Sequence, residues 1–322
     1  MHEMGLTRRG FLGATAAGAA AAGLAGCRPE STEPKGDKPL NVRFGLNLLV
    51  YTAGFTKDKI DLITKVADFG YDGVEIPFND LSLLDAPATR QAMEKAGVGM
   101  TACCVMRPGE NPCSPDAEER KRAVARLKRM VDLTGEMGGE AVAGPLYSPC
   151  SYLTGKAATD EELKWCAECL SAAADHAEKA DIPLAIEPLN RFETYVINTV
   201  DQALAMVERV GSPYLTVQVD TFHANIEEKD TGESIRKAGK HLGHFHASES
   251  DRGVPGTGQV AWEEAFAALR DVGYDKWVTI ESFATGILDL CAAASIWRPI
   301  YDSADGLARD GLAFLKKMAG QA

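Results

Sequence analysis

The sequence predicts a single eight-stranded β/α barrel, and three observations lead to this prediction. Strand-like and helix-like segments alternate from about residue 41 to the end of the 322-residue chain. Four acidic or imidazole residues end successive strand-like runs, and they are 33, 26 and 35 residues apart, about the length of one strand–helix–strand repeat. Residues 68–75 and 271–281 also echo each other, since each places a Gly-Tyr-Asp turn before a strand that ends in Glu.

The expected elements follow in order from apolar runs and helical periodicity. Four strands are expected at residues 43–51, 71–77, 99–106 and 140–147, and four more end near Glu187, Asp220, His246 and Glu281. Helices are expected at residues 57–69, 86–96, 115–137, 160–180, 200–210, 233–239, 262–271 and 304–318. Eight strands with short connections fit one barrel over residues 41–322 better than an open doubly wound sheet.

The first 27 residues have the features of an export signal. The run T-R-R-G-F-L is a twin-arginine pattern, and the Ala/Gly-rich run that follows is too short and too weakly apolar to span a membrane. Leu-Ala-Gly-Cys, ending at Cys27, has the form of a lipoprotein cleavage site, so we expect lipidation of Cys27; an ordinary signal peptide is the alternative. Residues 28–40 are Pro-rich and charged, as in a flexible linker. The expected location is the bacterial periplasm, or the cell envelope through a lipid anchor.

Composition restricts the partners and the role of the cysteines. A net charge of −12 without a Lys/Arg cluster argues against binding to nucleic acid. Contact with a membrane is expected only through a lipid anchor at Cys27. The remaining seven cysteines are scattered, which does not suggest a disulfide framework. Cys166 and Cys169 lie in a helical pattern and are expected to pack in the core and not to bind zinc.

Glu187, Asp220, His246 and Glu281 form the candidate functional site. The carboxyl ends of neighbouring strands meet at one mouth of a β/α barrel, so these side chains are expected to converge. A single strand-end carboxylate is more often solvated or capping, but several buried together are costly without a cation. Oxygen-rich ligation with one imidazole suits Mn²⁺ best, with Co²⁺ or Mg²⁺ as alternatives, and does not suit structural zinc.

Three further polar residues follow the candidate ligands and are expected on loops at the same mouth. Glu193 is six residues after Glu187, His223 three after Asp220, and Arg252 six after His246. A surface ion pair for Arg252 and a helix cap or packed imidazole for His223 are the simpler interpretations. His244 shares a strand face with His246 and is expected behind it.

The long motifs around these residues resemble one family. E-P-L-N-R-F-E (187–193), D-T-F-H-x-N-I-E-E (220–228), G-H-F-H-x-x-E-x-x-R-x-x-P-G-x-G-x-x-x-W (243–262) and I-W-R (296–298) resemble the ketose 3-epimerases (D-tagatose and D-allulose, or psicose, 3-epimerases) of the xylose-isomerase-like TIM barrels. The resemblance extends from about residue 47 to 317.

The resemblance implies a role for each matching residue. Glu187, Asp220, His246 and Glu281 match the metal ligands, and Glu187 and Glu281 match an acid/base pair on the two faces of carbon 3. Glu193, His223 and Arg252 match residues that hold the oxygens of carbons 1 to 3. The implied reaction is metal-dependent epimerisation of a free ketose through a cis-enediolate. Relatives commonly form homodimers or homotetramers.

The chain departs from the family pattern where the family closes over the sugar. The segment after the fourth strand, G-P-L-Y-S-P-C-S-Y-L, lacks the family's Trp, and either Tyr147 or Tyr152 could replace it. The alternative function is a lyase, dehydratase or isomerase of the same superfamily acting on oxidised sugars such as 3-keto-glycosides or inososes. A different class, a lipid-anchored sugar-binding protein, is disfavoured because binding alone would not need both Glu187 and Glu281.

Overall fold

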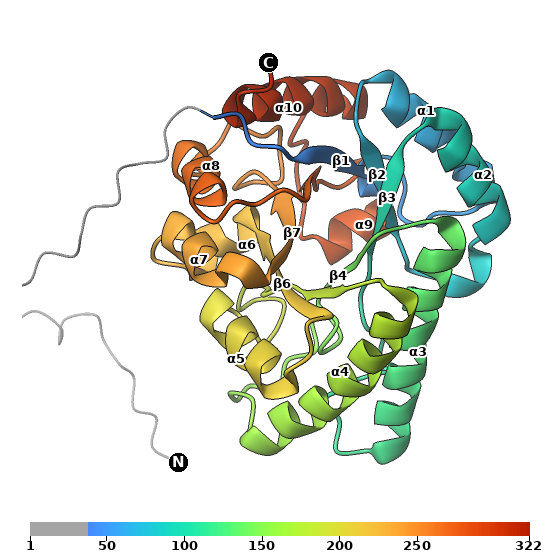
Figure 1. The fold of residues 1–322 in the computed structure, drawn as a ribbon, viewed down its shortest axis with the longest axis vertical. Helices are drawn as coiled ribbons and strands as arrows, with labels where there is room; N and C mark the ends of the chain where they lie inside the picture. Colours follow the sequence, from blue (N-terminus) through green and yellow to red (C-terminus); the bar gives the residue numbers. More distant parts are fainter. Residues whose placement is uncertain (1–37) are drawn as a thin grey trace, which may run out of the picture. The chain divides into compact units, whose positions relative to one another are not determined.

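The computed structural model describes residues 38–322, which contain a closed barrel of eight parallel strands. Each strand pairs with the next along the chain, and β8 pairs with β1 to close the ring. The strands occupy the centre and the helices surround them (Figure 1). The predicted single β/α barrel is therefore confirmed.

The elements alternate regularly along the chain. The strands are β1 (Arg43–Asn47), β2 (Gly73–Pro77), β3 (Gly99–Cys103), β4 (Val142–Gly144), β5 (Leu184–Ile186), β6 (Leu215–Asp220), β7 (Leu242–Ala247) and β8 (Trp277–Ile280). The helices are α1 (Asp61–Asp68), α2 (Ala86–Ala96), α3 (Ala117–Met137), α4 (Asp160–Ala180), α5 (Val200–Val210), α6 (Thr221–Glu227), α7 (Thr231–Ala238), α8 (Trp262–Asp271), α9 (Leu288–Ala293) and α10 (Ala304–Ala319).

The predicted N-terminal features lie largely outside the described residues. These are the export signal of residues 1–27, the lipidation site Cys27 and most of the linker at 28–40. Leu40, the last residue of that expected linker, is buried, and its backbone N–H donates to the carbonyl oxygen of Ala319 at 2.9 Å. The packed domain thus begins at least one residue before the expected boundary.

Two short helices were not predicted, and one of them carries a candidate residue. His223 lies in α6 and not in a loop, because α6 begins directly after β6. Asp220 Oδ1 accepts hydrogen bonds from the backbone N–H groups of Phe222 and His223, at 2.6 and 3.2 Å, and so caps this helix. The second short helix, α9, lies in the long connection between β8 and α10.

The close packing of Gly144 helps to place the chain at the end of β5. Gly144 has φ +128°, and a Cβ atom there would lie 2.2 Å from the carbonyl oxygen of Cys104. The carbonyl oxygen of Gly144 accepts a hydrogen bond from the backbone N–H of Glu187 at 3.0 Å. A larger residue at 144 would therefore displace the backbone that carries Glu187.

The barrel interior holds an unusual set of polar side chains. Branched apolar residues dominate the interior of most such barrels. Here several interior strand residues are polar and almost completely buried, namely Glu75, Thr101, Gln218, His244, His246 and Thr279. A buried polar layer of this kind is costly unless its groups are paired or bind a ligand. The interior is therefore shaped for function as well as for packing.

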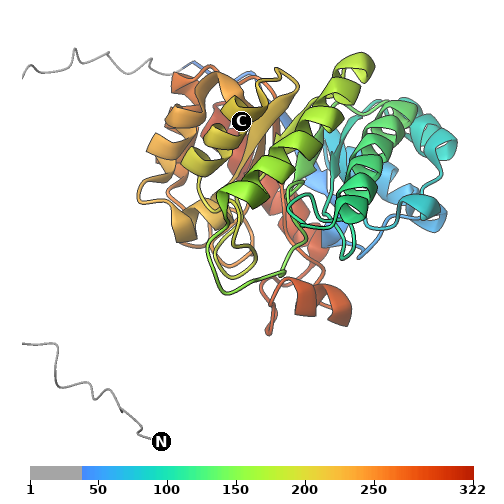
Figure 2. The ribbon, with the colours of Figure 1, turned by 90° about the horizontal axis from the view of Figure 1, so that it is seen from below.

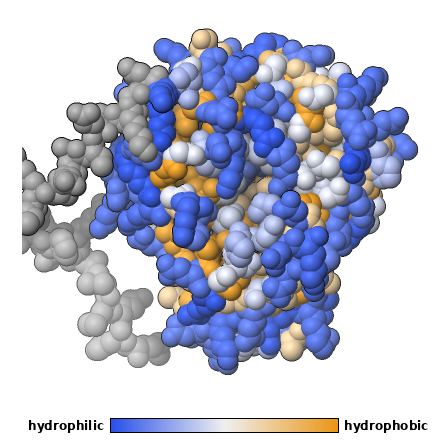
Figure 3. All heavy atoms as spheres, viewed as in Figure 1, coloured by the Kyte–Doolittle hydropathy of each residue, from blue (hydrophilic) through white to orange (hydrophobic). Residues whose placement is uncertain are grey.

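The outer ring of helices presents a polar surface. In the face shown in Figure 3, polar residues cover most of the helices and apolar residues appear mainly in the recesses between them. Among residues 38–322, no helix combines the length and the apolar character that crossing a membrane requires.

The start of α4 offers a test of local stability. Thr159 Oγ1 accepts from the backbone N–H of Glu162, and the Glu162 carboxylate accepts from the backbone N–H of Thr159, which forms a capping box. We expect Thr159→Ala to lower the free energy of unfolding by about 1 kcal/mol. Urea denaturation measures this difference, with Thr154→Ala as the matched control outside a helix. Equal losses in both variants would contradict the assigned cap.

Candidate metal centre

The structure brings the four predicted metal-ligand residues to one point at the carboxyl end of the barrel. Glu187 and Glu281 directly follow β5 and β8, Asp220 ends β6, and His246 lies near the end of β7. One ligand atom from each lies within 4.8 Å of those of the other three. His246 Nδ1 is 3.7 Å from Glu187 Oε1, 3.5 Å from Asp220 Oδ2 and 3.6 Å from Glu281 Oε1.

This cluster has the chemistry of a divalent-cation site. His246 Nδ1 and Glu187 Oε1 are buried and have no hydrogen-bond partner within the described part of the chain. Burial raises the pKa of Glu187 well above its usual value, and the charges of Glu281 and Asp220 add to this effect against the opposing imidazole of His246. A bound cation would satisfy the unpaired atoms and offset the repulsion between carboxylates. Three carboxylates and one imidazole therefore fit such an ion.

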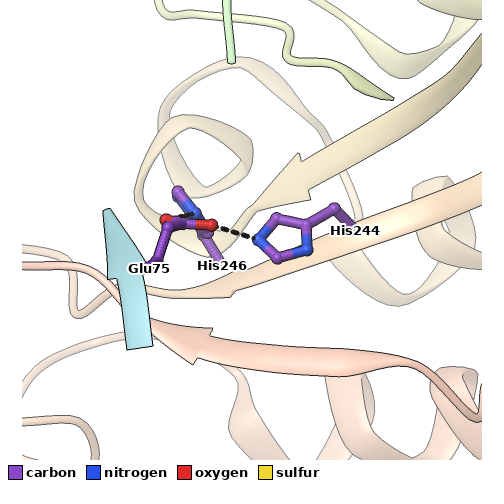
Figure 4. Close-up of side chains that lie close together, drawn as sticks. All are labelled: Glu75, His244 and His246. Atoms are coloured by element: carbon purple, nitrogen blue, oxygen red, sulfur yellow. Dashed lines mark hydrogen bonds and ion pairs between the residues drawn. The ribbon is translucent and has the colours of Figure 1, made fainter. Parts of the chain in front are cut away.

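Glu75, on β2, is the central residue behind this cluster. Its Oε1 lies 2.7 Å from His246 Nε2, and its Oε2 lies 2.7 Å from His244 Nε2. Figure 4 shows the carboxylate between the two imidazole rings. Asn47 Nδ2 and Thr101 Oγ1 also donate to Glu75, at 2.9 and 2.8 Å. One carboxylate thus collects donors from β1, β3 and β7.

These contacts orient His246 for ligation. Burial alone would raise the pKa of Glu75, but the charges and hydrogen bonds of His246 and His244 outweigh it and hold the pKa well below the usual value. Although burial disfavours the charged form, Glu75, Glu281 and Asp220 raise the pKa of His246 well above its usual value, so the ring carries both protons when no cation is bound. A cation at the cluster would displace the proton from Nδ1; because an ionised Glu75 can only accept, the remaining proton would lie on Nε2. Nδ1 would then direct its lone pair toward an ion held between the three carboxylates, as a metal-binding imidazole requires.

Sequence reasoning did not identify Glu75 as a functional residue. The available signal was the echo between residues 68–75 and 271–281, in which Glu75 and Glu281 each follow a Gly-Tyr-Asp turn, although Glu75 lies in the middle of β2 and Glu281 just after β8. His244 was expected behind His246, and the structure places it there, completely buried. His244 and Glu75 also form a second group with His246 that could hold a metal ion.

Arg252 lies directly beside the cluster. Its Nη1 donates to Glu281 Oε2 at 2.7 Å and to Asp220 Oδ2 at 3.1 Å. The guanidinium carbon lies 3.9 Å from the ring centre of Phe222 and 5.1 Å from that of Phe283. Although burial disfavours the charged form, Asp220 and Glu281 hold the pKa of Arg252 above its ordinary value. Arg252 therefore places a fixed, buried positive charge beside the site. The simpler interpretation from the sequence, a surface ion pair, does not describe this residue.

His223 and Glu193 extend this polar arrangement outward. The backbone N–H of Asn190 donates to His223 Nδ1 at 3.0 Å, and Asn190 Nδ2 donates to Glu193 Oε1 at 2.7 Å. Burial lowers the pKa of His223 to about 4, so the ring is neutral at neutral pH. With Nδ1 accepting, the proton lies on Nε2, which is 3.1 Å from Arg252 Nη2. The side-chain nitrogens of Arg252 and His223 thus lie next to each other beside the cluster.

The loop that carries Arg252 is organised around Glu249. The carboxylate of Glu249 accepts hydrogen bonds from the backbone N–H groups of Ser250, Gly256 and Val260 and from the Trp262 indole, at 2.8 to 3.2 Å. Arg252 itself has a left-handed backbone with φ 63°. The motif from Gly243 to Trp262 therefore contains most of β7, the loop after it and the first residue of α8, and hydrogen bonds to Glu249 hold the loop that carries Arg252.

The two tyrosines that could replace the family's Trp have different surroundings. Tyr147 is completely buried, and its hydroxyl donates to the carbonyl oxygens of Glu187 and Ile197 at 2.8 and 3.0 Å. Tyr147 therefore supports the chain after β5 and cannot act as a cover. Tyr152 is half exposed and packs edge-on against Tyr195. Cys166 and Cys169 are buried on α4, as expected.

Comparisons with known proteins agree on one family. Residues 63–318 match the family described as xylose isomerase-like TIM barrel. A protein of Synechocystis named "Probable ketose 3-epimerase" is 33% identical over 86% of this chain and 96% of its own length. The D-psicose 3-epimerase of Agrobacterium fabrum is 34% identical over 80% and 92%. The crystal structure of D-allulose 3-epimerase from Methylomonas superposes with a TM-score of 0.83, at 28% identity over 87% of this chain and 99% of that one.

The position of Glu75 leads to a prediction about metal affinity. We expect Glu75→Gln to weaken Mn²⁺ binding about 10- to 100-fold, because Gln cannot fix the proton on Nε2 of His246 as a carboxylate does. Titration calorimetry with Mn²⁺ measures the affinity, and the exposed Glu263→Gln serves as control. Unchanged affinity in the Glu75 variant would show that the carboxylate does not orient the ligand.

The loop around Glu249 leads to a prediction about pH and stability. Although burial opposes ionisation, the hydrogen bonds that Glu249 accepts from Ser250, Trp262, Val260 and Gly256 lower its pKa. Its stabilisation is therefore present above the unfolded pKa of about 4.3 and is lost as the pH falls through the lower folded value.

We accordingly expect Glu249→Gln to reduce the free energy of unfolding by about 1 to 3 kcal/mol at pH 7, with a smaller difference from wild type in acid. Urea denaturation at pH 7 and near the lower limit of native folding measures both values. The exposed Glu208→Gln is the control. A loss that did not shrink in acid would exclude the ionised carboxylate as the cause.

Proposed function

The chain belongs to the ketose 3-epimerases of the xylose isomerase-like TIM barrel family, and we propose that it is a metal-dependent isomerase that epimerises a free ketose at carbon 3. One observation carries the proposal. Glu187 and Glu281 converge on one cluster from strands that are separated in the ring by β6 and β7, beside the paired donors of Arg252 and His223. Epimerisation needs this combination of two carboxylates and a site for an oxyanion.

In this proposal Glu187 and Glu281 exchange the proton of carbon 3. One carboxylate removes the proton from one face, and the carboxylic acid on the other side returns a proton to the opposite face. The reverse reaction exchanges their roles.

The same cluster would hold the metal ion. Glu187, Asp220, His246 and Glu281 are the proposed ligands, and Mn²⁺ is the proposed ion, with Co²⁺ and Mg²⁺ also compatible with this donor set. When bound, the ion polarises the ketone and supplies positive charge next to the reacting carbons. Glu75 would contribute by holding the proton of His246 on Nε2, which leaves Nδ1 to bind the ion.

The residues outside the cluster are proposed to hold the sugar. The donors of Arg252 and His223 would bind the oxygen on which negative charge develops as the cis-enediolate forms. Glu193, held by Asn190, accepts a hydrogen bond and would orient a sugar hydroxyl or the adjoining side chains. The aromatic rings around the Arg252 guanidinium limit its movement, so its donors are already in place before the substrate arrives.

The alternative lyase, dehydratase or aldose–ketose isomerase reactions would begin with the same proton removal. The relatives described above are named for epimerisation, so these alternatives are not favoured. A sugar-binding protein without catalysis would not account for two converging carboxylates and an orienting Glu75.

Export is a separate part of the proposal and rests on the sequence alone. The twin-arginine pattern and the Cys27 motif support transport of the folded enzyme to the periplasm and anchoring through a lipid on Cys27. Mass spectrometry of the mature N-terminus tests this, because a lipidated Cys27 and an unmodified cleavage product differ in mass.

Proton exchange at carbon 3 tests the proposed reaction. With Mn²⁺ in D₂O, we expect proton NMR to show deuterium at carbon 3 of D-fructose, D-tagatose or D-allulose, together with the epimeric sugar. Glu281→Gln should keep the fold and reduce exchange by about 10²-fold or more, because one face of carbon 3 loses its acid or base.

Mn²⁺ content is measured in the same samples to separate loss of chemistry from loss of the ion, and Glu208→Gln should behave as wild type. Turnover near the wild-type rate in metal-loaded Glu281→Gln would remove this residue from the reaction. The absence of exchange with all three sugars would contradict the proposed epimerase.

A further inference from the structure

A large cavity continues outward from the residues proposed to hold the sugar. Its volume is about 660 Å³. Asn190, Glu193 and Arg252 form its inner part, and Phe192, Ile226 and Trp297 lie among the residues of its outer part. This volume falls in the range of sites that enclose drug-sized ligands, whereas a free hexose is considerably smaller. The cavity therefore has room for more than the sugar that reacts.

The outer part of the cavity carries exposed aromatic rings. Trp297 is 77% exposed and Phe192 is 71% exposed, although both line the same cavity. They come from different connections, since Phe192 follows β5 and Trp297 follows α9. Figure 2 shows the segment with α9, coloured red, projecting from one end of the barrel. Rings exposed to solvent at the entrance of a sugar site offer flat apolar faces, on which the C–H faces of a sugar ring can pack.

The segment after β4 leaves this cavity open. It has no Trp, and its Tyr147 is turned inward to the carbonyl oxygens of Glu187 and Ile197. Within the described residues, Ser151 is the one member of residues 145–154 that lines the cavity. This side of the cavity thus remains accessible.

The charges around the cavity favour a neutral occupant. Arg252 is engaged by Asp220 and Glu281, and Arg298 lies 3.2 Å from Asp251. Glu193 contributes a negative charge on the inner side. Arg252 and Arg298 are the two cationic side chains among the described residues that line the cavity, and both already contact carboxylates. Neither is free to bind a phosphate group, which disfavours a sugar phosphate.

From these observations we propose that the cavity is a subsite for a second sugar ring, and that the preferred substrate is a ketose glycosylated on the oxygen of carbon 4, 5 or 6. The inference rests on the proposed epimerase function. Reaction at carbon 3 needs an open-chain ketose whose carbons 1 to 3 carry free oxygens at the cluster. The second ring must therefore be attached at the far end, which faces Trp297 and Phe192.

Two reducing disaccharides test the subsite in the full-length protein loaded with Mn²⁺. Isomaltulose carries glucose on carbon 6 of fructose, and lactulose carries galactose on carbon 4. We expect kcat/KM for exchange at carbon 3 to be at least about tenfold higher for one of them than for D-fructose. Trp297→Ala and Phe192→Ala should each lower the disaccharide value about tenfold, mainly through KM, and change the D-fructose value less than about twofold.

The exposed Leu83→Ala, which lies outside the cavity lining, serves as control and should leave all values unchanged. Isomaltulose should also change the tryptophan fluorescence of the wild type and not that of Trp297→Ala. Equal kcat/KM for D-fructose and both disaccharides, without an effect of Trp297→Ala, would overturn the subsite while leaving the epimerase intact.

Three other results would also overturn the inference. Preference for fructose 6-phosphate would show an anion subsite. A change in molecular mass by light scattering in Trp297→Ala would show that this ring is a contact between copies of the chain. Exchange with none of the ketoses would contradict the proposed epimerase and this inference with it.

Discussion

The hydrogen-bonded contact between Glu75 and His246 is the constraint on which the rest of the site depends. It crosses the barrel interior from β2 to β7 and buries a carboxylate that is stable there only because two imidazoles, Asn47 and Thr101 surround it. In return, the carboxylate fixes which nitrogen of His246 faces Glu187, Asp220 and Glu281. The hydrogen bonds of Glu75 to Asn47, Thr101 and His246 thus form a polar network in the barrel interior that sets the geometry of the cluster.

A second set of contacts connects this cluster to the place where a substrate would lie. Glu249 holds the loop after β7 from within, the loop places Arg252, and Arg252 contacts both Asp220 and Glu281. His223 joins the same arrangement because Asp220 caps the helix that carries it. The loop after β7, the candidate metal ligands and the donors to the substrate are therefore connected by direct contacts. A substitution that displaces the loop should also displace Arg252 and change the positions of the Asp220 and Glu281 carboxylates.

Most of the barrel and its strand-end residues could be predicted from the sequence. Glu187, Asp220, His246 and Glu281 are recognisable because parallel strands in a barrel end at the same mouth, so their order along the chain implies their convergence. Glu75 and Glu249 were missed, since their importance comes from contacts across the barrel and within a loop that spacing does not reveal. The short helix α6 was missed because it depends on one cap, and the choice between Tyr147 and Tyr152 stayed open because burial is a tertiary property.

The location of a bound metal ion tests the account most directly. Two overlapping groups in the described chain could hold an ion, and they share His246. Anomalous diffraction from crystals grown with Mn²⁺ should show one peak among Glu187, Asp220, His246 Nδ1 and Glu281, with Glu75 hydrogen-bonded to His246 Nε2 and away from the ion. A peak between Glu75, His244 and His246, or the absence of a peak at the four-residue cluster, would contradict it.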